Sequence, residues 1–142
     1  MLKVFRGAKI YTMDKKNTVL FNVDLWVKDG KIIGFGTEAD VPSDAEVVNA
    51  EGTVITPGLI DIHTHVGIWR EIDEQVNDAN EYASPVTPGL YVIDGIDIHH
   101  FSFELARRGG VTTVQTGPGS ANPIGGIWCI LKTGGNSLDE RI

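Results

Sequence analysis

The sequence has few cysteines and few clustered basic residues, and both shortages exclude classes of protein. Its one cysteine, Cys129, excludes an internal disulfide framework and favours a reducing compartment. Lysine and arginine total 12 against 19 aspartate and glutamate, a net charge of −7, and no basic cluster extends beyond Arg107-Arg108. Nucleic acids and anionic membranes need such clusters, so neither is expected as a partner.

Long apolar runs are also missing. No stretch approaches the roughly 18 apolar residues of a membrane-spanning helix. Residues 1–6 alternate charged and apolar side chains, unlike the apolar segment of a signal peptide. Apolar residues still make up 42% of the chain, which is typical of a globular protein. We therefore expect a globular cytoplasmic protein of one domain, or of parts of two.

Residues 1–52 carry the pattern of short β-strands. Apolar and polar residues alternate loosely over 4–11 and 19–27. Asp29-Gly30 stands between two apolar runs, and this dipeptide accepts the positive φ angles of a type I′ hairpin turn. Several short strands joined by turns predict a small β-sandwich-like domain that ends at residue 52.

Residues 53–142 follow a different pattern, in which strand, helix, strand and loop succeed one another. An apolar stretch over 53–62 lacks clean alternation, which is typical of a parallel strand buried on both faces. The β-branched residues 111–116 predict a second strand, parallel to the first. This order indicates βα units of the α/β class.

A helix is predicted between these two strands. Its expected N-cap is Asp97, and Ile98, Phe101 and Leu105 recur at i, i+3 and i+7 to form an apolar face. Gly109-Gly110 should end the helix. We expect the apolar face to pack against the sheet.

His63 and His65 stand two residues apart at the end of the first predicted strand. Because the direction of side chains in a strand repeats every two residues, both imidazoles should point to the same side and could share one ion. Zinc, iron and manganese accept imidazole nitrogen, and sites of parallel α/β folds lie beyond the carboxyl ends of strands. The alternative for this pair is an ordinary solvated strand end.

A second histidine pair, His99 and His100, partly repeats the first, because Asp97-Ile-His99 has the letters of Asp61-Ile-His63. This copy opens the predicted helix, where adjacent side chains point about 100° apart. A shared metal is therefore not expected, and a solvent-facing helix start explains the pair better.

The Gly/Pro-rich loop over 117–126 follows the second strand on the same side as the first histidine pair. Its glycines permit close approach of a backbone, and Ser120 and Asn122 offer short polar side chains for a substrate. A substrate-contacting loop and a plain structural loop both stay open. Cys129 and the tryptophans are expected to be packing residues, although Trp69 could line a pocket.

Around the first histidine pair the sequence resembles the amidohydrolase superfamily, the metal-dependent hydrolases built on a (β/α)₈ barrel. The resemblance rests on Pro57-Gly-Leu-Ile-Asp-Ile-His-Thr-His65, preceded by a short β segment with an Asp-Gly hairpin. The run from Arg107 to Gly126 is also similar to a bacterial branch of imidazolonepropionase-related amidohydrolases. The resemblance spans essentially the whole chain.

The resemblance implies that His63 and His65 are the first two ligands of a divalent metal. Zinc is the expected metal, and iron and manganese are the alternatives. Asp61 would either orient these ligands from behind or be a hydrogen-bonded strand-end residue. The remaining ligands and the catalytic base of the family come from later strands, so no catalytic residue is expected in this chain. The implied reaction is hydrolysis of a C–N bond, in an amide or cyclic amide that is non-peptide or dipeptide-like, through metal-activated water.

Length restricts this interpretation. A (β/α)₈ barrel takes about 250 residues, far more than the stretch from 53 to 142. Ser137-Leu-Asp-Glu140 has the spacing of a capping box, so a helix is expected to begin just before the chain stops. We therefore expect the N-terminal part of a longer enzyme: part of a composite β domain over 1–52, and the start of a TIM-type barrel over 53–142.

Two alternatives stay open. One is a small β-rich binding or structural module without catalysis, or an inactive fragment. The other is a deacetylase or deaminase of the same superfamily. The expected partner is a small-molecule substrate, and self-association into a homo-oligomer also stays open.

Overall fold

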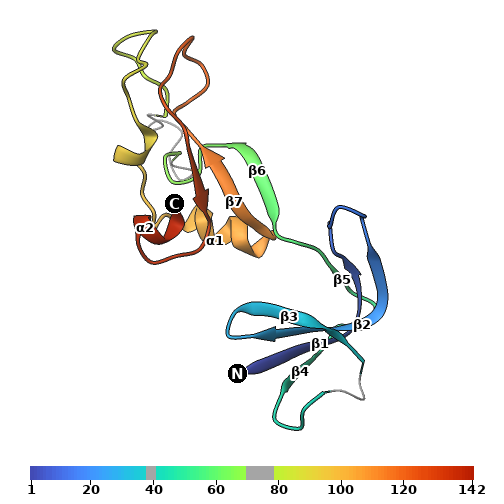
Figure 1. Cartoon of the computed structure of the whole chain (residues 1–142). Helices are drawn as coiled ribbons and strands as arrows, with labels where there is room; N and C mark the ends of the chain where they lie inside the picture. Colours follow the sequence, from blue (N-terminus) through green and yellow to red (C-terminus); the bar gives the residue numbers. More distant parts are fainter. Residues whose placement is uncertain (38–40, 70–78) are drawn as a thin grey trace. The chain divides into compact units, whose positions relative to one another are not determined.

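The computed structural model describes residues 1–37, 41–69 and 79–142. The chain forms two compact units, Met1–Pro57 and Gly58–Ile142 (Figure 1). The division falls after the boundary at residue 52 that composition suggests. The reason is that β5 (Val54–Ile55) pairs in parallel with the first strand and so belongs to the first unit.

The strands of the first unit form one five-stranded sheet. An antiparallel meander is followed by two strands parallel to the first: β1 (Leu2–Tyr11), β2 (Val19–Lys28), β3 (Lys31–Gly36), β4 (Glu46–Asn49) and β5. The hairpin between β2 and β3 turns at Asp29 and Gly30, with φ of 50° and 77°, as the dipeptide predicts. In the described residues the predicted sandwich is absent, because β1 pairs with β2 on one edge and with β4 and β5 in succession on the other.

The core of the first unit is small and apolar. Ala8, Ile10, Leu25 and Ala50 are buried together on the sheet. The buried carboxylate of Asp24 accepts the backbone N–H of Gly7 at 3.0 Å and lies 3.8 Å from Nε of Arg6. The buried carboxylate of this unit is therefore used in internal contacts.

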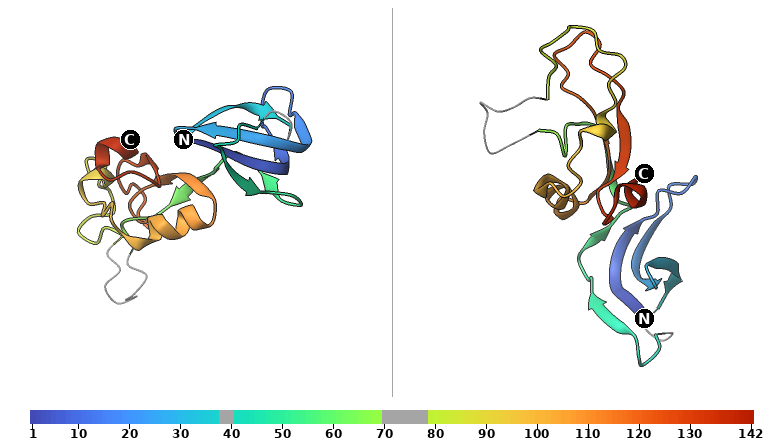
Figure 2. Two further views of the ribbon diagram at one scale, coloured as in Figure 1. Left: turned by 90° about the horizontal axis from the view of Figure 1, so that it is seen from below. Right: turned by 90° about the vertical axis from the view of Figure 1, so that its left-hand side faces the viewer.

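The second unit is built on a three-stranded mixed sheet in the order β6-β7-β8. β6 (Leu59–Thr64) and β7 (Val111–Thr116) are parallel, which confirms the predicted pairing, and β8 (Cys129–Lys132) is antiparallel to β7. Segments 79–92 and 117–127 run side by side beyond the carboxyl ends of β6 and β7 (Figure 2). These two segments surround the place where a site of a parallel fold is expected.

The first strand of the second unit differs from its prediction in two ways. It starts at Leu59 rather than at residue 53, because the chain leaves β5 at Pro57-Gly58 before it enters β6. It is also exposed rather than buried on both faces, with Ile60 and Ile62 at 67% and 72% exposure. The reason is that the buried cluster around Phe103 includes no residue of β6, so the described part of the chain leaves the faces of this strand uncovered; β6 is also an edge strand, paired there only with β7. The described residues form an open sheet and no barrel.

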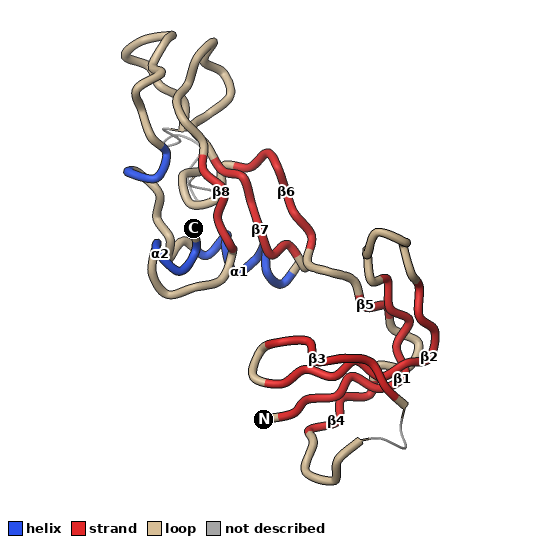
Figure 3. The backbone as a smooth tube through the Cα atoms, in the orientation of Figure 1, coloured by secondary structure: helices blue, strands red, loops and turns tan. Residues whose placement is uncertain are grey.

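The helices of the described residues are short and all lie in the second unit (Figure 3). α1 (Phe101–Arg108) precedes β7, a single 3₁₀ turn covers Val92–Asp94, and α2 (Leu138–Arg141) follows β8. Ser137 caps α2 by accepting the N–H of Glu140 at 3.3 Å, as the capping-box spacing predicts. No helix of the described residues is long and apolar enough to cross a membrane.

The start and the buried face of α1 both correct the prediction. His100 rather than Asp97 is the N-cap. Ser102 and Phe103 are the buried helix residues, and Phe103 packs with Val114 and Leu131, whereas Phe101 and Leu105 are exposed. Ile98 precedes the helix, and the side of α1 that carries Phe101 and Leu105 is exposed because the side that carries Phe103 packs on the sheet.

Candidate functional site

The two histidines predicted as metal ligands lie side by side at the carboxyl end of β6. His63 is near the end of the strand, and His65 follows its last residue, Thr64. Their ring centroids are 5.7 Å apart with the planes at 86°. Thr64 between them donates its hydroxyl to the carbonyl of Gln115 in β7 at 3.1 Å. The period-2 prediction thus places the rings together, and their role as ligands stays a prediction.

The His65 ring is held by a long-range hydrogen bond. Its Nδ1 lies 2.8 Å from the carbonyl oxygen of Gly117, which follows β7. A carbonyl can only accept, so Nδ1 carries the proton and Nε2 of the neutral ring has a free lone pair. Metal-ligating histidines commonly donate their other N–H to a carbonyl or carboxylate in this way. The contact at Nδ1 therefore leaves Nε2 as the ring nitrogen of His65 that could hold a metal.

Two tryptophans surround the pair. The Trp128 ring lies 4.9 Å from His63 and 5.6 Å from His65, centroid to centroid. The Trp69 ring stacks on His65 at 5.8 Å with an interplanar angle of 27°. The sequence predicts packing roles for these tryptophans, or a pocket wall for Trp69, and does not predict their contacts with the histidine rings. The position of Trp69 four residues after His65 was an available signal, but nothing local connects Trp128 to the pair.

Gly117 makes the close approach of Trp128 possible. A Cβ atom built on Gly117 would overlap the indole ring of Trp128. Gly117 is itself buried, and its carbonyl is the acceptor for His65. One glycine thus accommodates the indole and orients the imidazole.

The other predicted site residues have different surroundings. The carboxylate of Asp61 accepts the backbone N–H of His63 at 3.1 Å, which is a strand-end contact and does not involve a ring. Asn122 uses its amide on the backbone of Glu81, accepting at 3.0 Å and donating at 2.7 Å. Ser120 is exposed. Asn122 therefore fastens the 117–126 loop to its neighbouring segment, and substrate contact by Ser120 and Asn122 stays a prediction.

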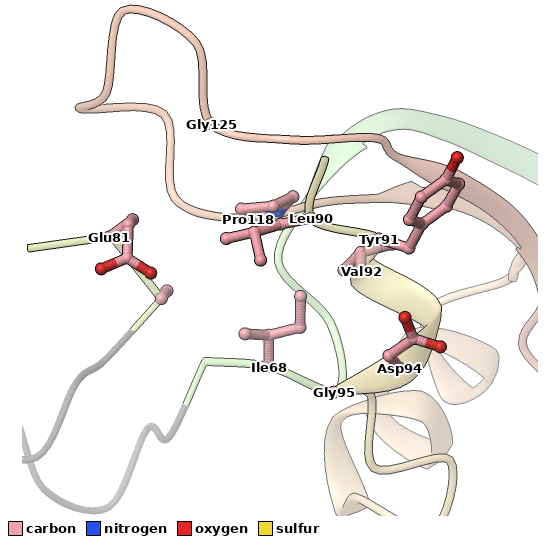
Figure 4. A pocket seen from close by; sticks show the side chains of 10 residues that line it. Ile68, Glu81, Leu90, Tyr91, Val92, Asp94, Gly95, Pro118 and Gly125 are labelled. Carbon is pink, nitrogen blue, oxygen red and sulfur yellow. The ribbon is translucent and has the colours of Figure 1, made fainter. Parts of the chain in front are cut away.

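A cavity of about 330 Å³ is lined by residues of the 117–126 loop, of segment 79–95 and by Ile68, and neither His63 nor His65 is among them (Figure 4). Ile68, one of its lining residues, donates its backbone N–H to the carbonyl of His65 at 3.0 Å. Pro118, which also lines it, directly follows Gly117. The remaining lining is mainly apolar, and Glu81 and Asp94 contribute carboxylates. The 117–126 loop therefore borders a hollow that is large enough for a small molecule.

The second histidine pair is used locally. Nδ1 of His100 lies 2.7 Å from the Ser102 hydroxyl, and the ring caps the start of α1. Within residues 1–37, 41–69 and 79–142, no three His, Cys, Asp or Glu side chains gather where they could hold one metal ion. In the part of the chain that the structure describes, His63 and His65 therefore have no third side chain of these types grouped with them.

No family model matches the chain, but individual known proteins do. The chain is 37% identical over 104 residues to amidohydrolase tasK of Hapsidospora irregularis, covering 72% of this chain and 11% of that protein. It is 43% identical over 116 residues to imidazolonepropionase of Mesorhizobium japonicum, covering 77% and 24%. The solved structure of an amidohydrolase from Thermotoga maritima MSB8 matches with a TM-score of 0.78 and 32% identity, over 99% of this chain and 36% of that one.

These matches extend over both units of this chain but over a minor part of each relative. The chain spans 11% and 24% of the two curated relatives and 36% of the solved structure. Its mostly β fold, with mixed sheets and two small helices, corresponds to one portion of a larger protein fold.

Proposed function

Because the chain belongs to the amidohydrolase superfamily, we propose that it carries the first two metal ligands, His63 and His65, of a metal-dependent hydrolase. The reaction proposed is hydrolysis of a C–N bond in an amide or cyclic amide. The observation that carries this proposal is that the His65 ring, held at Nδ1 by the Gly117 carbonyl, lies with its centroid 5.7 Å from that of the His63 ring.

The donor set is consistent with zinc, and with iron or manganese as alternatives, because neutral imidazole suits all three. When bound, the metal ion activates water as a nucleophile and polarises the carbonyl of the substrate. The residues of this chain act around it. His63 and His65 bind through ring nitrogens, the Gly117 carbonyl keeps the proton on Nδ1 of His65, and Trp128 and Trp69 cover the rings.

The cavity that the 117–126 loop borders supports a role for this loop in holding the substrate. Pro118 and Gly125 of this loop line it, opposite Leu90 and Val92 of the neighbouring segment. We propose that the part of the substrate that does not react occupies this mostly apolar space. Contact is then made by Pro118 and Gly125 in addition to, or in place of, the predicted Ser120 and Asn122.

The rest of the proposed enzyme concerns regions outside this chain. The chain covers a minor part of its relatives, so a closed TIM-type barrel, a composite β domain and the remaining ligands are proposals about a larger protein. A small-molecule substrate and a cytoplasmic location likewise stay proposals. Catalytic metal sites normally take three protein ligands and a water. We therefore expect the 142-residue chain alone to show no turnover of dipeptide, hydantoin or imidazolone substrates.

Metal titration tests the proposed function. Zn²⁺ binding is measured by calorimetry on the wild-type chain and on His63→Ala and His65→Ala, with His99→Ala as the matched control. Loss of a direct ligand should weaken binding by at least the tenfold typical of a lost supporting partner. The control should bind within about twofold of wild type, because His99 lies in the other histidine pair. Equal binding by wild type and His65→Ala would contradict the proposal.

A further inference from the structure

The position of Trp128 is set by the pairing of β7 with β8. Thr116 is paired with Cys129 in antiparallel register. The next residue of one strand and the preceding residue of the other, Gly117 and Trp128, therefore face each other just past the paired ends. The overlap expected for a Cβ at Gly117 agrees with this placement.

The indole reaches both imidazoles from this position. It meets His63 edge to face at 66° and His65 at a tilt of 57°. Edge-to-face and tilted contacts of this kind are favourable arrangements for rings. The Trp128 side chain is half-buried and so forms one wall of the pair rather than part of the unit's core, which is Phe103, Val114 and Leu131.

We propose that Trp128 is a positioning residue for the His63–His65 pair, seated by Gly117; this inference rests on the proposed function. Gly117 has two linked tasks, because it accepts from Nδ1 of His65 and leaves the space that the indole fills. A ring that is already fixed loses less conformational freedom when it binds a metal. Trp128 thereby strengthens metal binding without touching the metal.

The first test compares Trp128→Phe and Trp128→Ala. Supporting residues around metal ligands typically contribute 10–100-fold to affinity. We expect Trp128→Ala to weaken Zn²⁺ binding by roughly tenfold, and Trp128→Phe to retain most of the affinity because a phenyl ring keeps part of the contact. Trp26→Phe, in the other unit, is the control. Zn²⁺ binding by Trp128→Ala within twofold of wild type would overturn the proposal.

The second test uses the clash at Gly117. Gly117→Ala should displace the indole and weaken Zn²⁺ binding strongly in the wild-type background. In a Trp128→Ala background the added methyl group has space, so Gly117→Ala should change the Zn²⁺ affinity by less than about twofold. Such a difference between backgrounds is expected because the effects of residues in contact are not additive. Gly89→Ala is the matched control, because a Cβ at Gly89 meets no atom within 4 Å. Equal losses in both backgrounds would show that the clash is not the cause.

A third readout separates this inference from the proposed function. Imidazole ¹H–¹⁵N spectra of the metal-free chain report the tautomer of His65 and the ring environment of His63. Trp128→Ala should shift the His63 ring signals, whereas His99 signals stay in place. Unchanged His63 signals would refute the positioning role even if zinc binds. If the wild-type chain binds no zinc but Trp128→Ala still shifts the His63 signals, the proposed function is refuted. The contact of Trp128 with the imidazole rings is then still supported. Should Gly117→Ala fail to fold, the Trp128 variants still decide the matter.

Discussion

The tripeptide Asp-Ile-His occurs twice in the second unit, and the two copies begin in the same way. The carboxylate of Asp61 accepts the backbone N–H of His63 at 3.1 Å. The carboxylate of Asp97 accepts the backbone N–H of His99 at 2.9 Å. An aspartate that bonds the N–H two residues ahead is a local preference of this residue type. The same letters therefore produce the same local contact in a strand and in front of a helix.

The histidines that come next separate the two copies. His65 is joined to Gly117, 52 residues away, whereas His100 is joined to Ser102, two residues away. The first ring stands where β6, β7 and the β8 hairpin meet, and the second serves as the cap of α1. The comparison shows that a histidine becomes a candidate ligand through its long-range partner rather than through its neighbours in sequence.

The largest expected effect comes from disrupting the sheet on which the first pair depends. Leu131 is fully buried against Phe103 and Val114, so Leu131→Ala should lower the free energy of unfolding of the second unit by about 2–5 kcal/mol. Urea denaturation, followed by the fluorescence of Trp128, measures this free energy of unfolding. Its neighbour Ile130 is 63% exposed, and Ile130→Ala should change the value by less than about 0.5 kcal/mol. Equal effects would mean that β8 does not pack as described.

A smaller effect is expected where the chain after His65 is tied to β7. The buried hydroxyl of Thr116 donates to the carbonyl of Val66 at 2.9 Å. Thr116→Val keeps the shape and leaves that carbonyl without its donor, a loss of about 1–3 kcal/mol in the free energy of unfolding. The His65 ring signals should shift as well. Thr112→Val, at an exposed strand position, is the control, and a Thr116→Val chain as stable as this control would contradict the role of the bond.

The second pair should affect stability and leave metal binding unchanged. His100→Ala removes the side chain that caps α1, and loss of an N-cap costs about 0.5–2 kcal/mol. Zn²⁺ affinity should stay within about twofold of wild type. Thermal unfolding and calorimetry on the same sample give both values. Weaker zinc binding with unchanged stability would reverse the roles assigned to the two pairs.

The smallest expected effect concerns the thiol beside Trp128. Burial raises the pKa of Cys129 above its ordinary value, because the thiolate is poorly solvated there. At pH 8 the folded chain should therefore hold less thiolate than the unfolded chain and react more slowly with iodoacetamide. The rate should rise as the pH passes above the ordinary thiol pKa. A folded chain alkylated as fast as a urea-unfolded one would show that the β7–β8 hairpin is open.

Several features could be predicted because they depend on short-range chemistry. The turn at Asp29-Gly30 follows from the positive φ angles that this dipeptide accepts. The cap of α2 at Ser137 follows from a spacing of three residues. The adjacency of His63 and His65 follows from the period of a strand.

Other features could not be predicted because they depend on which faces of the helices and strands pack against one another. The periodicity around Ile98 and Phe101 was apolar at helical spacing, yet Phe103 is the residue that the sheet covers. The apolar run of β6 is typical of a buried strand, but its exposure depends on whether other elements pack on its two faces. Neither outcome is encoded in the spacing of the residues concerned.

The sequence by itself determined that two imidazoles would project together from the end of a strand, because backbone geometry alternates side chains whatever surrounds them. Only the tertiary structure decided which nitrogen of His65 is free and which ring supports the pair. Gly117 and Trp128 are distant from the histidines in sequence and reach them through the parallel pairing of β6 with β7 and the antiparallel register of β7 with β8. Contacts between residues so far apart in sequence form only when long loops close, and no local propensity specifies them.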